Sequence, residues 1–375
     1  MTPETSDNRT LPWFARPAAR TWRCPPAPAA VRDFHASLPD YAPTPLIELP
    51  VIADELGVGR LFVKDESSRL GLPAFKALGV SWAVHRVLAE RPESGDGAAP
   101  GPVTLVTATD GNHGRAVART ARRLGLRAHV FVAEGVHPRA SAAIAAERAE
   151  VTLVAGSYDM AVRRAAEAAA APGVVLVQDT AWPGYERIPG RIVEGYSTLC
   201  AEIDEQLAAA DAGPPGLVAV PVGVGSLAQA VVTHCRSRAA GPSASALLSV
   251  EPRAASCVLD SLLHGEPVSV TTGETTMAGL NCGTPSSLAW PHLRDGLDAA
   301  VAVTDADSDR AAADLTALGL SPGPCGAASL AGVRAALGGE GADGRRATLG
   351  LGPDSTVVLL STEGSEANPV RVTGT

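Results

Sequence analysis

Short runs rich in β-branched residues alternate with longer helical segments along most of this 375-residue chain. The runs predict strands at Leu61–Lys64, Val103–Thr107, Ala128–Val132, Val151–Val154, Val174–Gln178, Leu217–Pro221, Ala246–Val250, Ala299–Val303 and Thr356–Leu360. The segments between them predict helices near 76–91, 112–124, 138–149, 158–171, 190–210, 226–238, 304–318 and 326–337. This alternation predicts an α/β fold of largely parallel sheets flanked by helices. Ligands bind such sheets at the carboxyl ends of the strands.

Composition limits the class of partner. With 46% hydrophobic residues the chain can bury the cores of one large or two ordinary domains. Its 31 basic and 40 acidic residues give a net charge of −9, so neither nucleic acid nor a membrane is an expected partner, and a small molecule is. Segments 92–102, 211–216 and Gly338–Asp354 are predicted to be linkers because they are rich in Pro and Gly.

The ends and the cysteines indicate a cytoplasmic protein. The first thirty residues, an expected N-terminal arm, carry several arginines and prolines and do not resemble a secretory signal, and no apolar run is long enough to cross a membrane. The six cysteines lack the spacing of a zinc site, and no metal is expected. A disulfide between Cys257 and Cys282 is left open, although a reducing compartment disfavours it.

Lys76 stands at the start of an apolar helical segment. Burial disfavours the charged form of a lysine, and a neutral amine can add to an aldehyde to form a Schiff base. An isolated lysine of this kind usually packs its stem and extends its head into water. Other segments of the chain favour the chemical role.

Loops that follow predicted strands supply those other features. Residues 107–114 (Thr-Ala-Thr-Asp-Gly-Asn-His-Gly) open a helix whose amides could hold an anion, and Asp110 is locally unfavourable there. Gly223 and Gly225 lie in a strand-to-helix turn that lacks the third glycine of a dinucleotide fingerprint and the lysine of a P-loop, which leaves a single phosphate as ligand. Asp179 and the hydroxyl pair Ser361 and Thr362 also end strands, where a helix-capping or turn role is the simpler interpretation.

A lysine, a one-phosphate turn and an Asn-bearing loop together suggest pyridoxal 5'-phosphate (PLP). With these motifs the chain resembles the two-domain fold type II PLP enzymes, and most closely the diaminopropionate ammonia-lyases. The resemblance covers residues 31–371 and rests on the segments 34–46, 69–76, 107–114, 177–182, 277–283 with 288–290, and 360–364. It implies a homodimer with a large cofactor-binding domain (31–80 and 191–375), a small domain (81–190) and the cofactor in the cleft.

The resemblance also assigns roles to individual residues. Lys76 would form the Schiff base, Asn112 would bind the phenolic oxygen of the cofactor, and Ser361 or Thr362 would face the pyridine nitrogen. The phosphate would be held by Gly223, Val224, Gly225 and Ser226. The substrate would contact Thr109, Asp110, His113 and Asp179, with Asp110 and Asp179 as bases on opposite faces of the bound amino acid.

The implied reaction is α,β-elimination of D- or L-2,3-diaminopropionate to pyruvate and two molecules of ammonia. Two carboxylates on opposite faces would serve both enantiomers and favour a β-ammonium over the hydroxyl of serine. Pro324 and Cys325 depart from the family pattern, which has an acidic residue near this position. Pro73 stands where the family tends to have Asn. Both departures bear on the identity of the substrate more than on the cofactor. A serine/threonine dehydratase, a β-replacement enzyme, an eliminase of a modified diamino acid and a non-catalytic PLP- or amino-acid-binding protein remain alternatives.

Overall fold

The computed structural model describes residues 11–90, 103–237 and 244–367. Their strands form two separate sheets. The strands are β1 (Trp13–Ala15), β2 (Leu46–Glu48), β3 (Arg60–Asp65), β4 (Thr104–Thr109), β5 (Arg127–Ala133), β6 (Glu150–Val154), β7 (Val174–Leu176), β8 (Leu217–Pro221), β9 (Ala246–Pro252), β10 (Ala299–Val303) and β11 (Thr356–Ser361).

The larger sheet has seven strands in the order β1-β10-β9-β8-β11-β3-β2. Its five central strands are parallel, and the edge strands β1 and β2 are antiparallel to their neighbours. The smaller sheet has four parallel strands in the order β6-β5-β4-β7. Two largely parallel sheets confirm the predicted fold class.

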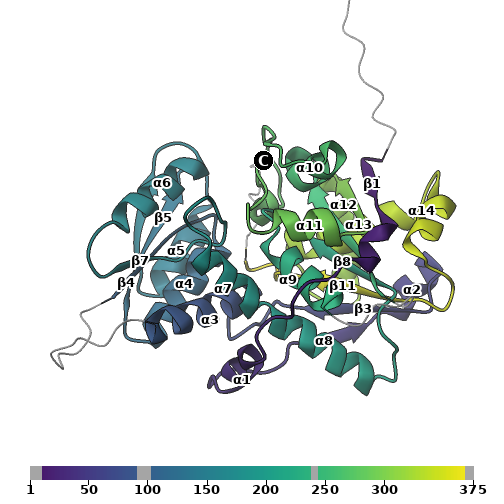
Figure 1. The fold of residues 1–375 in the computed structure, drawn as a ribbon, viewed down its shortest axis with the longest axis horizontal. Helices are drawn as coiled ribbons and strands as arrows, with labels where there is room; N and C mark the ends of the chain where they lie inside the picture. The colour runs from purple at the N-terminus through teal and green to yellow at the C-terminus, as the bar shows by residue number, and fades with distance from the viewer. Residues whose placement is uncertain (1–10, 91–102, 238–243, 368–375) are drawn as a thin grey trace, which may run out of the picture.

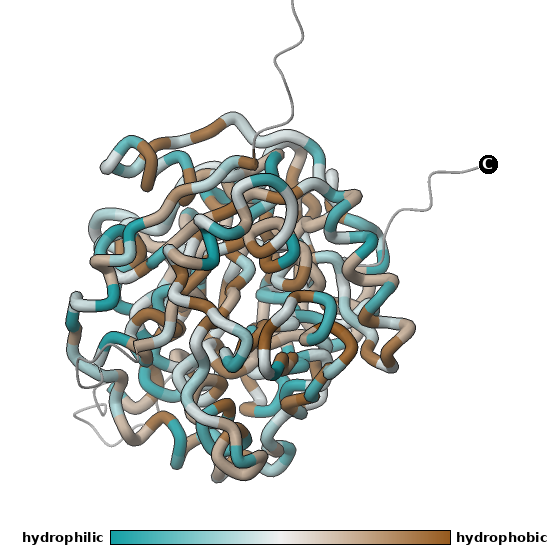
Figure 2. The backbone as a smooth tube through the Cα atoms, turned by 90° about the vertical axis from the view of Figure 1, so that its right-hand side faces the viewer, coloured by the Kyte–Doolittle hydropathy of each residue, from teal (hydrophilic) through white to brown (hydrophobic). Residues whose placement is uncertain are grey.

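Helices cover both sheets. They are α1 (Ala30–Ala36), α2 (Pro50–Leu56), α3 (Lys76–Ala89), α4 (Asn112–Arg123), α5 (Pro138–Ala146), α6 (Tyr158–Ala168), α7 (Arg187–Gly195), α8 (Ser197–Ala209), α9 (Ser226–Arg236), α10 (Cys257–His264), α11 (Trp290–Gly296), α12 (Asp305–Ala317), α13 (Pro324–Leu337) and α14 (Ala342–Leu349). Figure 1 shows the smaller sheet with α4, α5 and α6 on one side of the molecule and the larger sheet with α8 to α14 on the other. Hydrophilic and hydrophobic segments alternate along the outer helices (Figure 2), as expected of helices that bury one face.

The structure corrects two predicted elements. The segment Gly338–Asp354 is not a plain linker, because it contains α14. The single helix predicted at 190–210 is two helices that meet at the buried residue Tyr196. Of the other two predicted linkers, 211–216 joins α8 to β8, and 92–102 lies outside the described residues.

The expected N-terminal arm is partly described. Residues 1–10 lie outside the described part, and β1 pairs with β10 at the edge of the larger sheet. The division into an arm, a large domain and a small domain at residues 30, 80 and 190 stays a prediction. Among the described residues, no helix combines the length and the apolar character that a membrane span needs.

Helix α3, which carries Lys76 as its first residue, crosses α7 at very short range. A Cβ atom on Gly79 would lie 2.6 Å from Cε1 of Tyr196 and 2.7 Å from Cγ2 of Ile192, and one on Gly195 would lie 2.7 Å from the Cα of Gly79. Because protein interiors are close-packed, only residues without a side chain allow this crossing. The two glycines therefore fix α3 one turn after Lys76.

Replacement of Gly79 by alanine should lower the free energy of unfolding by about 1–3 kcal/mol, because the added methyl group overpacks the crossing. Gly344→Ala in α14 is the matched control, since a Cβ atom there meets nothing within 4 Å. The control should change stability by at most about 1 kcal/mol, in the stabilising direction. Urea unfolding of the two variants measures the difference; equal stability of both would contradict the steric account.

Candidate active site

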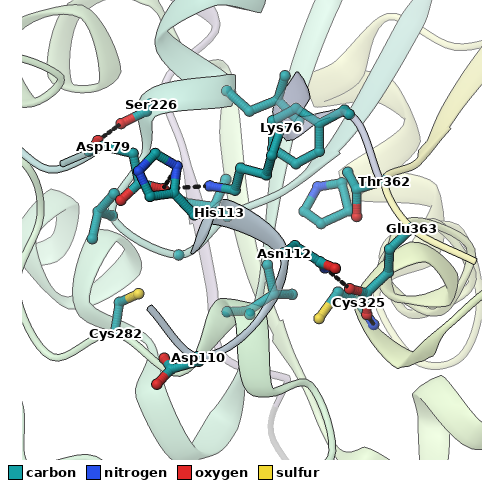
Figure 3. Close-up of a pocket in the computed structure, with 18 of the residues that line it drawn as sticks. Lys76, Asp110, Asn112, His113, Asp179, Ser226, Cys282, Cys325, Thr362 and Glu363 are labelled. Carbon is teal, nitrogen blue, oxygen red and sulfur yellow. Dashed lines mark hydrogen bonds and ion pairs between the residues drawn. The ribbon is translucent and has the colours of Figure 1, made fainter. Parts of the chain in front are cut away.

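A pocket lies where the carboxyl ends of strands from both sheets face each other. Its walls come from the start of α3, the β4–α4 loop, the loop after β7, the β8–α9 turn and the residues that follow β11 (Figure 3). The residues that line it are Phe75, Lys76, Thr109, Asp110, Gly111, Asn112, His113, Tyr158, Asp179, Pro221, Val222, Gly223, Val224, Gly225, Ser226, Leu227, Ala228, Gly279, Leu280, Cys282, Cys325, Thr362 and Glu363. Most of the predicted site residues thus meet in one place.

The segment before Lys76 is pinned to the end of β11. Ala74 forms an antiparallel bridge with Glu363. The Phe75 amide donates to the Thr362 carbonyl at 3.2 Å, and the Gly364 amide donates to the Pro73 carbonyl at 2.9 Å. These bonds fix the chain at the point where Lys76 enters the pocket.

Lys76 forms an ion pair with Asp179. Its Nζ donates to Oδ2 of Asp179 at 2.6 Å, and the two side chains are 20% and 11% exposed. Burial alone would lower the pKa of Lys76, as expected from the sequence, but the charge of the Asp179 carboxylate outweighs it and raises that pKa. The expectation that burial leaves this amine neutral is therefore wrong. Lys76 must lose its ammonium proton before it can attack an aldehyde, and the ion pair with Asp179 holds the proton on the amine.

Only two lysines exist in the sequence, Lys64 and Lys76. Lys64 is fully buried away from the pocket, where its Nζ donates to Oε2 of Glu202 at 2.7 Å and to the Thr44 carbonyl at 2.7 Å. Lys76 is thus the one lysine side chain that reaches the pocket.

Asp110 and Asp179 occupy the same pocket in opposite protonation regimes. Burial and the neighbouring charge of Asp179 raise the pKa of Asp110 to about 7. Burial opposes ionisation of Asp179 too, but His113 and Lys76 outweigh it and hold the pKa of Asp179 well below its usual range. Two carboxyl groups whose environments separate their pKa values are typical of paired acid–base sites.

His113 is a neutral residue with a defined tautomer. Its Nε2 donates to the Val177 carbonyl at 2.7 Å, which places the proton on Nε2, and burial lowers the pKa of the ring. Nδ1 lies 3.7 Å from Oδ2 of Asp179, is buried and has no hydrogen-bond partner within the described residues. The free nitrogen can therefore accept a proton from a ligand beside Asp179.

Thr109 shapes the β4–α4 loop. Its Oγ1 accepts from the amides of Gly111 and Gly114 at 3.0 and 2.9 Å, and so occupies part of the amide cluster that the sequence predicts to be an anion site. Asn112, the first residue of α4, extends its side chain into the pocket, where Nδ2 donates to Oε2 of Glu363 at 2.5 Å.

The β8–α9 turn has the geometry of a phosphate cradle. A Cβ on Gly223 would lie 2.9 Å from Sγ of Cys282, and one on Gly225, whose φ is +100°, would lie 2.5 Å from Cδ1 of Leu293. The turn leads into α9, whose first amides have no intrahelical acceptor and favour an anion. Ser226 Oγ donates to the Asp179 carbonyl at 2.7 Å and ties this turn to the opposite wall. With an amine and an amide side chain nearby, the residues present fit pyridoxal phosphate.

The side chains of Ser361 and Thr362, at the end of β11, point to different sides of the strand. Thr362 lines the pocket. Ser361 is buried with its Oγ directed at α13, 2.9 Å from where a Cβ of Gly326 would lie. Successive side chains of a strand point to opposite faces, so only one of the two can face a ligand.

Sequence reasoning missed three lining residues as functional groups. Tyr158, the first residue of α6, had no signal, whereas Glu363 lay in the family motif and Cys282 in a loop already noted. Burial and the charges of Asp110 and Asp179 raise the pKa of the Cys282 thiol to about 12, so it is a neutral group. Cys257, Cys282 and the other cysteines are free thiols, which closes the question of a disulfide for this structure.

The sequence matches the model of the family of pyridoxal-phosphate dependent enzymes over residues 38–362. The chain is 40% identical over 298 residues to a diaminopropionate ammonia-lyase of Salmonella typhimurium, an alignment that covers 73% of this chain and 72% of the relative. It is 34% identical over 351 residues to the diaminopropionate ammonia-lyase of Escherichia coli K12, which covers 89% of this chain and 87% of the relative.

The fold agrees with these matches. A crystal structure of the E. coli diaminopropionate ammonia-lyase with an aminoacrylate-PLP azomethine reaction intermediate superimposes with a TM-score of 0.85, 31% identity and 95% coverage of both chains. The same enzyme with D-serine gives a TM-score of 0.82 at 32% identity, over 94% of this chain and 90% of that one. This chain therefore belongs to the pyridoxal-phosphate-dependent enzymes and, within them, to the diaminopropionate ammonia-lyase family.

Proposed function

We propose that this enzyme cleaves 2,3-diaminopropionate into pyruvate and two molecules of ammonia by α,β-elimination. The observation that carries the proposal is the pair of carboxyl groups, Asp110 and Asp179, that share one pocket with Lys76. Relatives that are 40% and 34% identical over 298 and 351 aligned residues are diaminopropionate ammonia-lyases, which supports the substrate.

Pyridoxal phosphate, when bound, withdraws electrons from the α-carbon and so makes the α-proton acidic and the β-substituent able to leave. Lys76 would hold the cofactor, Asn112 would contact its phenolic oxygen, and Gly223 to Ser226 would bind its phosphate. Thr362, which lines the pocket, is better placed than Ser361 to face the ring nitrogen.

Asp110 and Asp179 would each take the α-proton of one enantiomer. The lowered pKa of Asp179 keeps it ionised and able to act as a base at every pH near neutrality, whereas Asp110 is the stronger base but is only half ionised near pH 7. A β-ammonium group would pair with either carboxylate, and the hydroxyl of serine or threonine would leave a buried charge without its partner. The same two residues thus supply both chemistry and specificity.

His113 and Thr109 would assist at the substrate side. His113 offers the free Nδ1 lone pair next to Asp179. The Thr109 oxygen accepts hydrogen bonds from two amides, which leaves its hydroxyl proton for the substrate.

We further propose a homodimer in the cytoplasm, on the strength of the family resemblance. Light scattering of the purified protein tests the dimer.

Purified holoenzyme should release ammonia and a keto acid in a two-to-one ratio from D- or L-diaminopropionate, and turn over serine and threonine at least about tenfold more slowly because they lack the second cation. Coupled assays with the four amino acids measure both products. Faster release of 2-oxobutyrate from threonine would identify a dehydratase instead. Tight cofactor binding with no turnover of any of these amino acids would support a non-catalytic binding protein.

Asp110→Asn and Asp179→Asn should each lower kcat for one enantiomer by at least about a hundredfold and affect the other enantiomer less, because each removes one general base. For the enantiomer that depends on Asp110, kcat/KM should rise with pH through about 7, since the base acts only when ionised. For the enantiomer that depends on Asp179 the same profile should be flat near neutrality, because the lowered pKa of that residue keeps it ionised.

Asp343→Asn, on the exposed surface of α14, makes the same change of charge and is the matched control for both variants. It should leave turnover of both enantiomers unchanged. Equal losses on both enantiomers in each active-site variant would refute the division of labour between the two faces.

A further inference from the structure

Glu363 brings a buried carboxyl group to the pocket wall, immediately after Thr362 at the end of β11. The residue is 2% exposed, and although it lies in the segment 360–364 that carries the family resemblance, the sequence assigned it no role. Figure 3 shows it directed at Asn112, with Cys325 beside it. It lies next to Cys325, one of the residues that depart from the family pattern.

The surroundings of Glu363 are built to receive a carboxylate. The amide of Cys325, in the first turn of α13, donates to Oε1 at 3.3 Å, and a helix N-terminus stabilises negative charge. A Cβ on Gly323 would lie 2.9 Å from Oε1, and one on Gly326 would lie 2.6 Å from the Glu363 carbonyl oxygen. Glycine at these two positions is what allows the acid to approach the helix end.

The carboxylate also determines the orientation of Asn112. An ionised carboxylate only accepts hydrogen bonds, so the amide nitrogen of Asn112, and not its oxygen, must face Glu363. That bond, 2.5 Å from Nδ2 to Oε2, uses one of the two N–H groups of the amide. The second N–H group remains for a ligand in the pocket.

The same segment also fixes Lys76, because Glu363 pairs through its backbone with Ala74. Glu363 therefore contacts three segments that line the pocket. These are the residues before α3, the start of α4 and the start of α13. Burial, together with the hydrogen bond to Glu363, holds the pKa of the Cys325 thiol well above its usual range, so this neighbour stays neutral.

We propose that Glu363 is a positioning residue that locks the Asn112 amide in the orientation needed to donate to the phenolic oxygen of pyridoxal phosphate. The inference rests on the proposed function only in that the pocket binds this cofactor; it does not depend on which amino acid is cleaved. Glu363, which follows β11, places its carboxylate at the N-terminal end of α13.

Cofactor binding to apoenzyme, without substrate, tests the proposal. Glu363→Ala should weaken pyridoxal phosphate binding by about fivefold, the loss expected when one charge-assisted hydrogen bond no longer orients its donor. Glu363→Gln, which keeps an acceptor of the same shape, should restore most of the affinity. Both affinities come from fluorescence titration, and the absorption maximum of the bound cofactor is recorded in parallel.

The decisive comparison is made in the background of Asn112→Ala. If Glu363 acts through Asn112, Asn112→Ala combined with Glu363→Ala should bind the cofactor no more weakly than Asn112→Ala alone, and both should share one absorption maximum. A loss of affinity as large in this background as in the wild type would overturn the proposal and leave Glu363 as a cap of α13. Unchanged affinity and spectrum in both single variants of Glu363 would overturn it as well.

Two further measurements separate other causes. Thermal unfolding of the apoproteins reports any loss of the α13 cap, and Glu366→Gln, an exposed acid three residues further on, is the matched control that should bind like the wild type. Wild-type protein that binds no pyridoxal phosphate would refute the proposed function itself, whereas tight binding without cleavage of diaminopropionate would refute only the substrate.

Discussion

The ion pair between Lys76 and Asp179 is the interaction on which the site depends. Lys76 follows β3 of the larger sheet and Asp179 follows β7 of the smaller one, and their charged atoms are 2.6 Å apart. The pair therefore exists only when the two sheets face each other in one arrangement. It also decides the protonation of the pocket, because the ammonium keeps Asp179 ionised and Asp179 in turn raises the pKa of Asp110.

Several unrelated contacts hold Lys76 in this position. Downstream, the close crossing of α3 and α7 fixes the helix axis, and the pairing of residues 73–75 with 362–364 fixes its entry. Upstream, Glu202 accepts from both Lys64 and Arg69 at 2.7 Å, and all three side chains are fully buried. Breaking such a buried pair is strongly destabilising, so the loop between β3 and α3 has one well-defined path. The reactive amine is thus placed by packing on one side and by charge on the other.

Much of this architecture could be predicted from the sequence, because buried parallel strands are recognisable as short apolar, β-branched runs between helices. The predicted strands and the start of α3 at Lys76 agree with the structure. The three-residue strand β2 was missed because it is too short to show a period, and α14 because its glycines resemble a linker. Arg345 and Arg346 stabilise that helix by donating to the carbonyls of Ala336 and Leu56, contacts that no local pattern reveals.

The residues of the site also fall into those that the sequence could predict and those that it could not. Lys76, Asp110, Asn112 and Asp179 were recognisable because each lies in a strand-to-helix connection, or at the first residue of the helix that follows it. The ion pair of Lys76 was not, since it joins residues 103 positions apart, and it reversed the expected direction of the lysine pKa. Glu363 was passed over for the same reason, because its partner Asn112 lies 251 positions away. Residue pairs that are distant in the sequence and meet only across the pocket can be recognised only once the fold is known.

The attachment point of the cofactor tests the central claim most directly. Reduction of the holoenzyme with borohydride, followed by proteolysis and mass spectrometry, locates the amine that carries pyridoxal phosphate. A single adduct is expected, on the peptide that contains Lys76. An adduct on Lys64, the other lysine in the chain, or on the N-terminal amine would contradict it.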